Sequence, residues 1–185
     1  RCGALIDGVS ARALGPAVVV IEHGRVTSVA PDAEIPDGVR AIDLAGYTCL
    51  PGLIDMHTHL TMRPEESLDL SENYRRTDQQ QAAISREHAR RTLLAGFTTV
   101  RDVGSYAAWA DRAIRDEIDR GETPGPRMQV AGIYLTIPGG GGDLVIPGHS
   151  ESEIPARLRA GVARGPEQFR QKAEIAVAGG ADLLK

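Results

Sequence analysis

The sequence predicts an α/β fold: the first half of a (β/α)8 TIM barrel, preceded by a small β-sandwich subdomain. From residue 51 onward, apolar and β-branched segments alternate with segments of helical pattern, which is typical of parallel β/α units. Four such strands occur in residues 51–185, whereas a complete barrel needs ~250 residues. We therefore assign residues 1–50 to the N-terminal part of the sandwich and residues 51–185 to strands 1–4 of the barrel.

Residues 1–50 show strand and turn patterns and no convincing helical pattern. His23 and Gly24 predict a tight turn between two runs rich in β-branched residues, which fits a hairpin. Two further short strands are expected on either side of Gly46. The predicted strands are residues 17–22, 25–29, 41–44 and 47–50.

The barrel segment predicts strands and helices in strict alternation. Gly96, Gly121 and Gly179 stand where the helices are expected to end, which is common for glycine. A doubly wound sheet is the alternative fold, but its first strand usually leads into a phosphate-binding glycine turn, and here the first strand ends in histidines. A glycine-rich loop, residues 138–165, follows the third strand. The predicted strands are 53–60, 97–103, 127–136 and 181–185, and the predicted helices are 78–95, 106–120 and 166–178.

Charge and composition exclude some classes of partner. A net charge of −4 offers no basic surface for nucleic acid, and no apolar run approaches the ~18 residues of a membrane span. Cys2 and Cys49 do not make a disulfide framework, so we expect a reducing, cytoplasmic location. Because residue 1 is Arg and not Met, we expect the sequence to begin inside a longer chain that could carry a leader. A half barrel has open strand edges, so we also expect more chain after Lys185.

The strongest chemical feature is His57-Thr58-His59 at the end of the first barrel strand. Side chains alternate along a strand, so His57 and His59 are expected on one face, with Asp55 one step earlier on the same face. Inward-facing residues at the C-terminal ends of barrel strands form the active site. Two imidazoles there can hold a divalent metal such as zinc, and a nearby carboxylate can orient an imidazole. For an isolated His-x-His pattern, a pair of surface histidines is the alternative.

The segment from Pro51 to His59 resembles the opening signature of the amidohydrolase superfamily. Gly96–Gly104 resembles the second strand of its branch near the prolidase-like and Xaa-Arg or Xaa-Lys dipeptidases, and imidazolonepropionases are more distant there. Many members of this branch carry a His within the glycine run 139–142, where this sequence has only Gly. Shorter segments that also resemble these families are 24–26, 43–46, 125–127 and 135–136 with 139–143.

Residues Gly180–Lys185 resemble the fourth strand of the superfamily, whose lysine is commonly carboxylated and bridges two metals. The resemblance implies that His57 and His59 bind one metal, and that a carbamate formed from CO2 on Lys185 joins it to a second. The expected cofactors are two divalent ions, with Zn2+ preferred. Two histidines and a proton-shuttling aspartate are expected from later strands. A plain strand-end lysine is the alternative.

Three further residues are substrate-pocket candidates. Tyr134 and Thr136 lie on one face near the end of the third strand, and core packing is the alternative for Tyr134. His149 lies in the glycine-rich loop, where it would either touch the substrate or remain solvated.

Other polar residues are expected to have supporting or local roles. Arg101 and Asp102 end the second strand, and one of them is expected to support the site or to pair with its neighbour. His23 in the hairpin turn and His88 in a charged helix are expected to be solvated or locally hydrogen-bonded.

The resemblance implies a binuclear metallohydrolase that cleaves a peptide or amide bond in a small-molecule substrate. A hydroxide bridging the two metals would attack the scissile carbonyl, and a dipeptidase or carboxypeptidase is the favoured activity. The alternatives are a cyclic-amide hydrolase, a mononuclear deaminase without a bridging lysine, and a non-catalytic relative that acts in binding or assembly. We expect a homo-oligomer without a nucleic-acid or membrane partner.

Overall fold

The computed structural model describes residues 1–31, 33–35 and 37–185. These residues form two compact units, Arg1–Gly52 and Leu53–Lys185. Within the described ranges, no helix is both long and apolar enough to cross a membrane.

The N-terminal unit is a four-stranded sheet with the order β3-β2-β1-β4. β2 and β3 form the predicted antiparallel hairpin, and its turn uses His23 and Gly24, which have φ angles of 51° and 74°. This sheet provides one layer of the predicted sandwich. The strands are β1 (Cys2–Leu5), β2 (Ala17–Glu22), β3 (Arg25–Pro31) and β4 (Leu44–Cys49).

The pairing of β1 with β4 was not predicted from the sequence. β1 pairs antiparallel with β2 and parallel with β4, so it lies in the middle of the sheet. β4 runs through Gly46 as one strand, whereas the sequence predicted two short strands at 41–44 and 47–50. At its start, the Leu44 amide donates to the carbonyl of Arg1 at 2.8 Å, and the N-terminal amine of Arg1 donates to the carbonyl of Ile42 at 2.9 Å.

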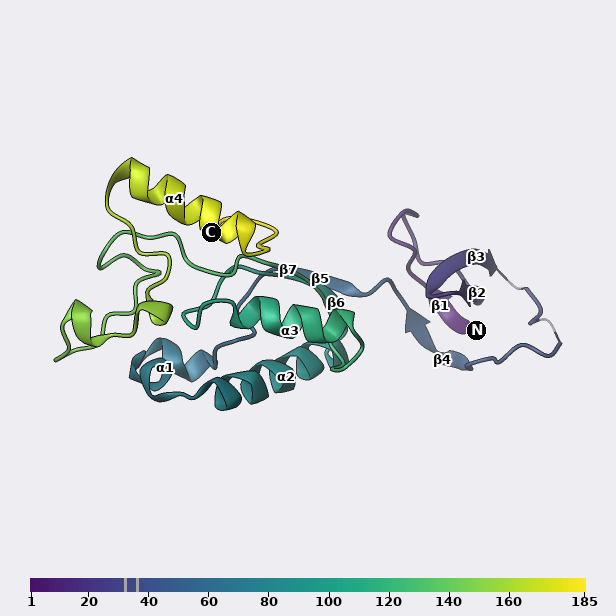
Figure 1. Cartoon of the computed structure of the whole chain (residues 1–185). Coiled ribbons are helices and arrows are strands. Elements are labelled where there is room, and N and C mark those ends of the chain that lie inside the picture. Colours follow the sequence, from purple (N-terminus) through teal and green to yellow (C-terminus); the bar gives the residue numbers. More distant parts are fainter. Residues whose placement is uncertain (32, 36) are drawn as a thin grey trace. The chain divides into compact units, whose positions relative to one another are not determined.

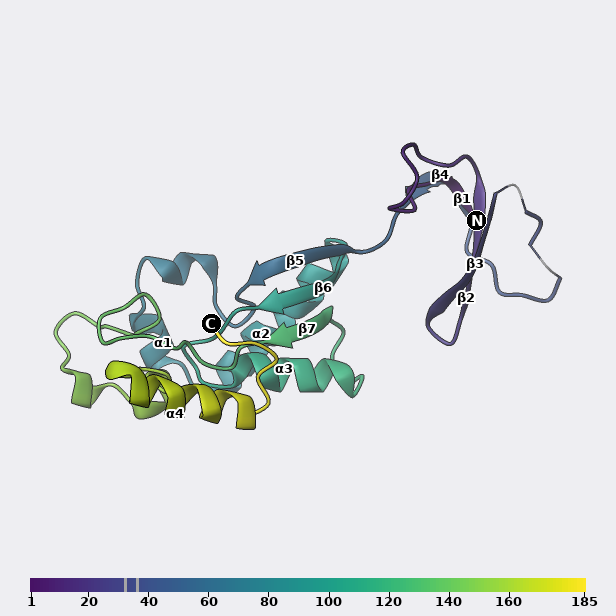
Figure 2. The same ribbon diagram turned by 90° about the horizontal axis from the view of Figure 1, so that it is seen from above.

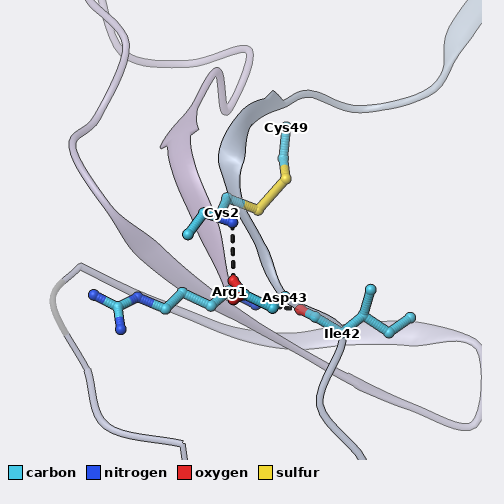
Figure 3. Close-up of a disulfide and its surroundings, with 6 residues drawn as sticks. Arg1, Cys2, Ile42, Asp43 and Cys49 are labelled. Carbon is cyan, nitrogen blue, oxygen red and sulfur yellow. Dashed lines mark hydrogen bonds between the residues drawn. A yellow bond between two sulfur atoms is a disulfide. The ribbon is translucent and has the colours of Figure 1, made fainter.

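A disulfide joins Cys2 and Cys49, whereas the sequence analysis expected no disulfide framework and a reducing location. The Cα atoms lie 5.9 Å apart although the residues are separated by 47 positions in the sequence (Figure 3). Only the β1–β4 pairing brings them together, and the sequence spacing alone does not reveal it. Disulfides persist in oxidising compartments, so the cysteines no longer support a reducing location.

The second unit contains a three-stranded parallel sheet with the order β5-β6-β7, whose arrows run side by side in Figure 2. The strands alternate with helices, which confirms the predicted parallel β/α succession. The strands are β5 (Leu53–Thr58), β6 (Phe97–Asp102) and β7 (Arg127–Val130), and the main helices are α2 (Asp78–Leu94), α3 (Ala110–Asp119) and α4 (Gly165–Ala178). The short helices are η1 (Pro64–Ser67), α1 (Ser71–Arg75), η2 (Glu151–Glu153) and η3 (Ala156–Leu158).

Capping and backbone geometry explain where the helices begin and end. α2 begins after Thr77, whose hydroxyl accepts a hydrogen bond from the Gln80 amide at 3.2 Å, and it ends before Gly96, which has a φ of 95°. α3 begins at Ala110, later than the predicted residue 106. The reason is that Trp109 has a φ of 70°, in the left-handed region, which interrupts the helix there.

The third and fourth predicted strands are shorter than expected. β7 ends at Val130, because Gly132 turns the chain with a φ of 76°, whereas the prediction extended it to residue 136. Residues 181–185 form no assigned strand in the described chain. They nevertheless form backbone hydrogen bonds with the end of β7 and with the chain that follows it. The Asp182 amide donates to the Val130 carbonyl at 2.8 Å, and the Leu135 amide donates to the Lys185 carbonyl at 2.8 Å.

Two apolar clusters hold the second unit together. α2 and α3 cover one face of the sheet (Figure 1), and the first cluster fills the space between them. The second cluster packs the glycine-rich loop against the chain that follows β6. The first comprises Leu60, Ala89, Val100, Ile114, Met128 and Val130, and the second Tyr106, Leu144, Ile146, Ile154 and Leu158.

Candidate active site

A cavity of about 420 Å³ lies where β5 ends. It brings together most of the residues that the sequence singled out: His57, His59, Lys185, Tyr134 and Thr136 all line it. The rest of its wall is mainly apolar or glycine and consists of Met62, Tyr106, Leu135, Gly141 and Gly142.

His57 and His59 point into this cavity from consecutive same-face positions. Their ring centroids are 5.4 Å apart, with 69° between the ring planes. Thr58 faces the other way, and its hydroxyl lies 3.4 Å from the carbonyl oxygen of Arg101. Because a zinc–imidazole bond is about 2.0–2.1 Å long, rings this close can reach the same ion.

One tautomer of His59 is favoured by its surroundings. Its Nδ1 lies 3.0 Å from the carbonyl oxygen of Gly104, and the Tyr134 hydroxyl lies 3.0 Å from that same oxygen. The Tyr134 hydroxyl also lies 3.0 Å from Nδ1 itself. A carbonyl can only accept hydrogen bonds, so the contact with Gly104 favours the tautomer that carries its proton on Nδ1, with the Tyr134 hydroxyl donating to the carbonyl. Nε2 therefore keeps its lone pair, which is what a metal ligand requires.

Burial also keeps the His59 ring neutral. Burial is the largest cause that lowers the pKa of His59, and the neighbouring His57 and Lys185 act in the same direction. The hydrogen bond to Gly104 opposes them, but the pKa remains below its ordinary value. A neutral imidazole has a free nitrogen for coordination.

Two fully buried carboxyl groups, those of Asp102 and Asp111, bind the backbone of segments that lead to cavity residues. Oδ2 of Asp102 accepts a hydrogen bond from the Leu60 amide at 2.6 Å, while its Oδ1 has no hydrogen-bond partner among the described residues. Burial, followed by the charge of Asp111, raises the pKa of Asp102 to about 8. Asp111 is partnered by the amides of Gly132 and Arg112, and burial raises its pKa as well.

Several predicted site residues lie elsewhere or act differently. Asp55 accepts a hydrogen bond from the His57 backbone amide at 3.0 Å, so it supports the backbone and not, as predicted, an imidazole ring. His149 does not line the cavity; it is exposed and its ring packs 5.3 Å from that of Tyr74. Arg101 donates to the carbonyl of Met56 at 2.7 Å.

Several residues at the site were not predicted as site residues from the sequence, although Gly104 and the glycine run 139–142 belong to segments that resemble the family: Gly104, Met62, Tyr106, Gly141 and Gly142. Gly104 has a φ of 117°, and a glycine directly after a predicted strand is a usable signal for such a conformation. Which ring its carbonyl meets depends on the pairing of β5 with β6, which no local pattern contains.

The donor set determines which metal site could form here. Among the residues described, no group of three or more His, Cys, Asp or Glu side chains could hold a metal. The cavity offers two imidazoles and the amine of Lys185, which becomes an anionic oxygen donor only after carboxylation. Asp102 adds no fixed negative charge to this donor set, because burial raises its pKa to about 8 and favours the protonated carboxyl group. Two neutral imidazoles with anionic oxygen donors fit a zinc-type ion.

The chain is similar to known proteins in sequence and in fold. The family model described as the amidohydrolase family matches residues 48–182. A dihydroorotase from Mycobacterium tuberculosis is 42% identical over 57 residues, which are 30% of this chain and 13% of that protein. An imidazolonepropionase from Cupriavidus necator is 40% identical over 63 residues, which are 32% of this chain and 15% of that protein.

Solved structures resemble almost the whole chain. A Xaa-Pro dipeptidase with methionine bound in its active site has a TM-score of 0.82 and 28% identity, over 99% of this chain and 45% of that one. A prolidase complexed with N-methylphosphonate-L-proline has a TM-score of 0.82 and 29% identity, over 99% of this chain and 44% of that one. An atrazine chlorohydrolase from Arthrobacter aurescens complexed with zinc has a TM-score of 0.52 and 25% identity, over 72% of this chain and 35% of that one. The chain thus spans less than half the length of the structures that it matches.

Proposed function

The chain belongs to the amidohydrolase family, and on this basis we propose that it contributes part of the active site of a metal-dependent hydrolase that cleaves a peptide bond in a small substrate. One observation carries the proposal: His57, His59 and Lys185 line one cavity. The dipeptidase and prolidase that share this fold support a dipeptide as substrate.

In this proposal His57 and His59 hold one divalent ion, and Lys185, once carboxylated, joins it to a second. The neutral Nζ of Lys185 forms a bond to the carbon of CO2 and releases one proton to water, which leaves an anionic carbamate with two oxygens. Bound divalent ions lower the pKa of a coordinated water to a usable hydroxide and polarise a carbonyl.

Other residues of the chain prepare the cavity for this chemistry. The Gly104 carbonyl and the Tyr134 hydroxyl hold the His59 ring with Nε2 free. Met62 and Tyr106 form an apolar wall that excludes water from one side of the cavity. Exclusion of water strengthens the electrostatic interactions that act on the substrate.

A cyclic-amide hydrolase is the second candidate function. It is supported by the sequence matches to a dihydroorotase and an imidazolonepropionase, each of which is limited to about a third of the chain.

A substrate panel distinguishes the two functions. The full-length protein, loaded with Zn2+, is tested on Xaa-Pro dipeptides and on dihydroorotate, with and without a metal chelator. We expect release of free proline, loss of this activity with the chelator and recovery with added Zn2+. His57→Ala should abolish turnover, whereas the matched control His149→Ala should retain it because His149 lies outside the cavity. Turnover of dihydroorotate alone would favour the second function, and turnover of neither would contradict both.

The carbamate has its own test in the mass of the intact protein under native conditions. We expect a gain equal to one CO2 that disappears in Lys185→Ala. Lys172 in α4 is the matched control, so Lys172→Ala should keep the gain. An unmodified Lys185 in a metal-loaded sample would contradict the bridging role and favour a mononuclear site.

A further inference from the structure

We propose that Asp102–Gly104, at the end of β6, is a clamp that fixes the backbone position and the ring tautomer of His59. The proposal rests on the proposed function where it treats His59 as a metal ligand. The orientation of the ring itself, however, is a property of the metal-free chain and can be tested without any ion.

Two hydrogen bonds of the clamp hold the backbone on either side of His59. Oδ2 of Asp102 accepts a hydrogen bond from the Leu60 amide at 2.6 Å. The amide of Val103 donates to the carbonyl of Thr58 at 3.0 Å. Asp102 is 0% and Val103 3% exposed, so water cannot replace these bonds, and losing a partner leaves a buried polar group unpaired.

The third part of the clamp acts on the ring. The carbonyl of Gly104 accepts the proton of His59 Nδ1 at 3.0 Å, and the Tyr134 hydroxyl donates to the same oxygen at 3.0 Å. Three consecutive residues of the clamp thus hold three consecutive residues at the end of β5. The Tyr134 hydroxyl also lies 3.0 Å from Nδ1. In the tautomer that the Gly104 carbonyl favours, Nδ1 carries the proton and Nε2 keeps its lone pair.

Gly104 can do this only as glycine. Its φ of 117° lies in the region that side chains avoid. A Cβ on Gly104 would also lie 2.6 Å from the ring of Tyr134, so the ring or the backbone would have to move. Gly104→Ala should therefore displace the carbonyl that orients His59.

The chain contains a matched control for the aspartate. Asp111 is also 0% exposed, and it also accepts a backbone hydrogen bond, from the Gly132 amide at 2.7 Å. It holds the chain after β7 and makes no hydrogen bond to residues 58–60 in the described structure. Replacing it should disturb the fold as much as replacing Asp102 does, without releasing the end of β5.

Gly132 is the matched control for the glycine. It has a φ of 76°, and a Cβ on it would lie 2.5 Å from the ring of Trp109. Gly132→Ala therefore introduces the same two kinds of strain as Gly104→Ala. Its carbonyl accepts from the Trp109 amide and not from a cavity residue.

The first experiment measures the tautomer in metal-free, full-length protein labelled with 15N-histidine, with the His59 signals assigned through His59→Gln. We expect the Nδ1-protonated tautomer in wild type, Asp111→Ala and Gly132→Ala. Asp102→Ala and Gly104→Ala should show a mixture of tautomers. Asp102→Asn, whose amide oxygen can still accept from Leu60, should resemble wild type and remains informative if Asp102→Ala fails to fold. The clamp proposal would be overturned if wild type carried its His59 proton on Nε2. It would also be overturned if the clamp variants and the control variants changed the tautomer to the same extent.

The second experiment measures the dissociation constant of Zn2+ by competition with a chromophoric chelator, alongside the melting temperature. Loss of a group that orients a metal ligand typically weakens binding by roughly 10–100-fold, and we expect this range for Asp102→Ala and Gly104→Ala. The two control variants should bind as wild type does despite a similar fall in melting temperature. If wild type binds no Zn2+ while its tautomer is as expected, the proposed function fails and the clamp stands. If wild type binds and the clamp variants bind equally well, only the clamp fails.

Discussion

The two units of the chain are stabilised in different ways. The N-terminal unit, Arg1–Gly52, buries few apolar side chains and is cross-linked by a disulfide. The second unit, Leu53–Lys185, buries two apolar clusters together with charged and polar groups that are paired inside the protein. The buried apolar residues of the N-terminal unit are Cys2, Leu5, Ala17 and Val18.

This difference indicates which conditions should affect each unit. A small sheet with little apolar burial gains much of its stability from a covalent constraint on the unfolded chain. A larger unit can bury charges, but each buried charge then depends on its partner. Reductant should therefore act on the first unit, and acid or loss of an ionic partner on the second.

The largest effect is expected from the buried ion pair between Asp143 and Arg159. Both guanidinium contacts are short, at 2.6 Å and 2.8 Å, and the Asp143 side chain is only 1% exposed. Asp143→Ala should lower the unfolding free energy by up to about 3–5 kcal/mol, because the mostly buried Arg159 then keeps only the exposed Glu151 as an ionic partner. The sole tryptophan, Trp109, reports the second unit by fluorescence during urea unfolding.

The control for this prediction is an exposed pair in the same unit. Arg170 and Glu167 are 64% and 63% exposed, so Arg170→Ala should change the unfolding free energy by about 1 kcal/mol or less. Equal effects of Asp143→Ala and Arg170→Ala would show that burial does not distinguish these pairs.

Reduction of the disulfide is expected to have the next largest effect. Removing a cross-link that closes a loop of this size typically costs about 2–4 kcal/mol, and Cys49→Ser should act like the reductant. The loss should appear in amide hydrogen exchange of β1 to β4, while exchange in β5 to β7 stays unchanged. Uniform loss of protection in both sheets would contradict separate stabilisation of the units.

Acid should weaken the second unit through Asp143. Hydrogen bonds from Arg159 are the largest cause that lowers the pKa of Asp143, so the unfolded chain binds more protons in acid than the folded chain does. The stability that Asp143 contributes is complete above its unfolded pKa of about 3.9 and is lost as pH falls through its lower folded pKa. Its size is about 1.4 kcal/mol for each unit by which the two pKa values differ. The raised pKa values of Asp102 and Asp111 act in the opposite direction in both proteins, so the Asp143 contribution is the difference between wild type and Asp143→Asn. In urea titrations from pH 6 downward, the stability of wild type relative to Asp143→Asn should fall with pH.

The smallest effect concerns the start of α2. The Thr77 hydroxyl accepts from the Gln80 amide, and Thr77→Ala should cost about 1 kcal/mol in the second unit. Thr27→Ala, in β3, provides a comparison at an exposed position of the first unit and should leave Trp109 fluorescence unfolding unchanged. A Thr77→Ala variant as stable as wild type would show that the cap contributes little.

Local patterns were sufficient to predict the three main helices and most strands, but not β1, α1 or the short helices η1, η2 and η3. The hairpin at His23 and Gly24, the capped α2 and the parallel strands β5 and β6 all follow from turn residues, caps and apolar runs. The shorter β7 and the late start of α3 depend on positive φ angles at Gly132 and Trp109. Only the packing of neighbouring segments determines such angles.

The candidate site was predictable to a similar degree. The alternation of side chains along β5 was enough to place His57 and His59 together, and the resemblance to a family added Lys185. Three contacts join segments that are more than 40 residues apart in the sequence. They are the disulfide, the contact between the Gly104 carbonyl and His59, and the hydrogen bond from the Leu60 amide to Asp102. Such contacts depend on strand pairing, which a single sequence does not specify.

The proposed function depends on a metal centre formed by the His57–His59 pair and Lys185. Elemental analysis of purified full-length protein measures the bound metal, with His59→Ala and the exposed-histidine control His149→Ala prepared in parallel. We expect two divalent ions per chain in wild type and in His149→Ala, and a marked loss in His59→Ala. Wild type without bound metal, or His59→Ala with the full complement, would contradict it.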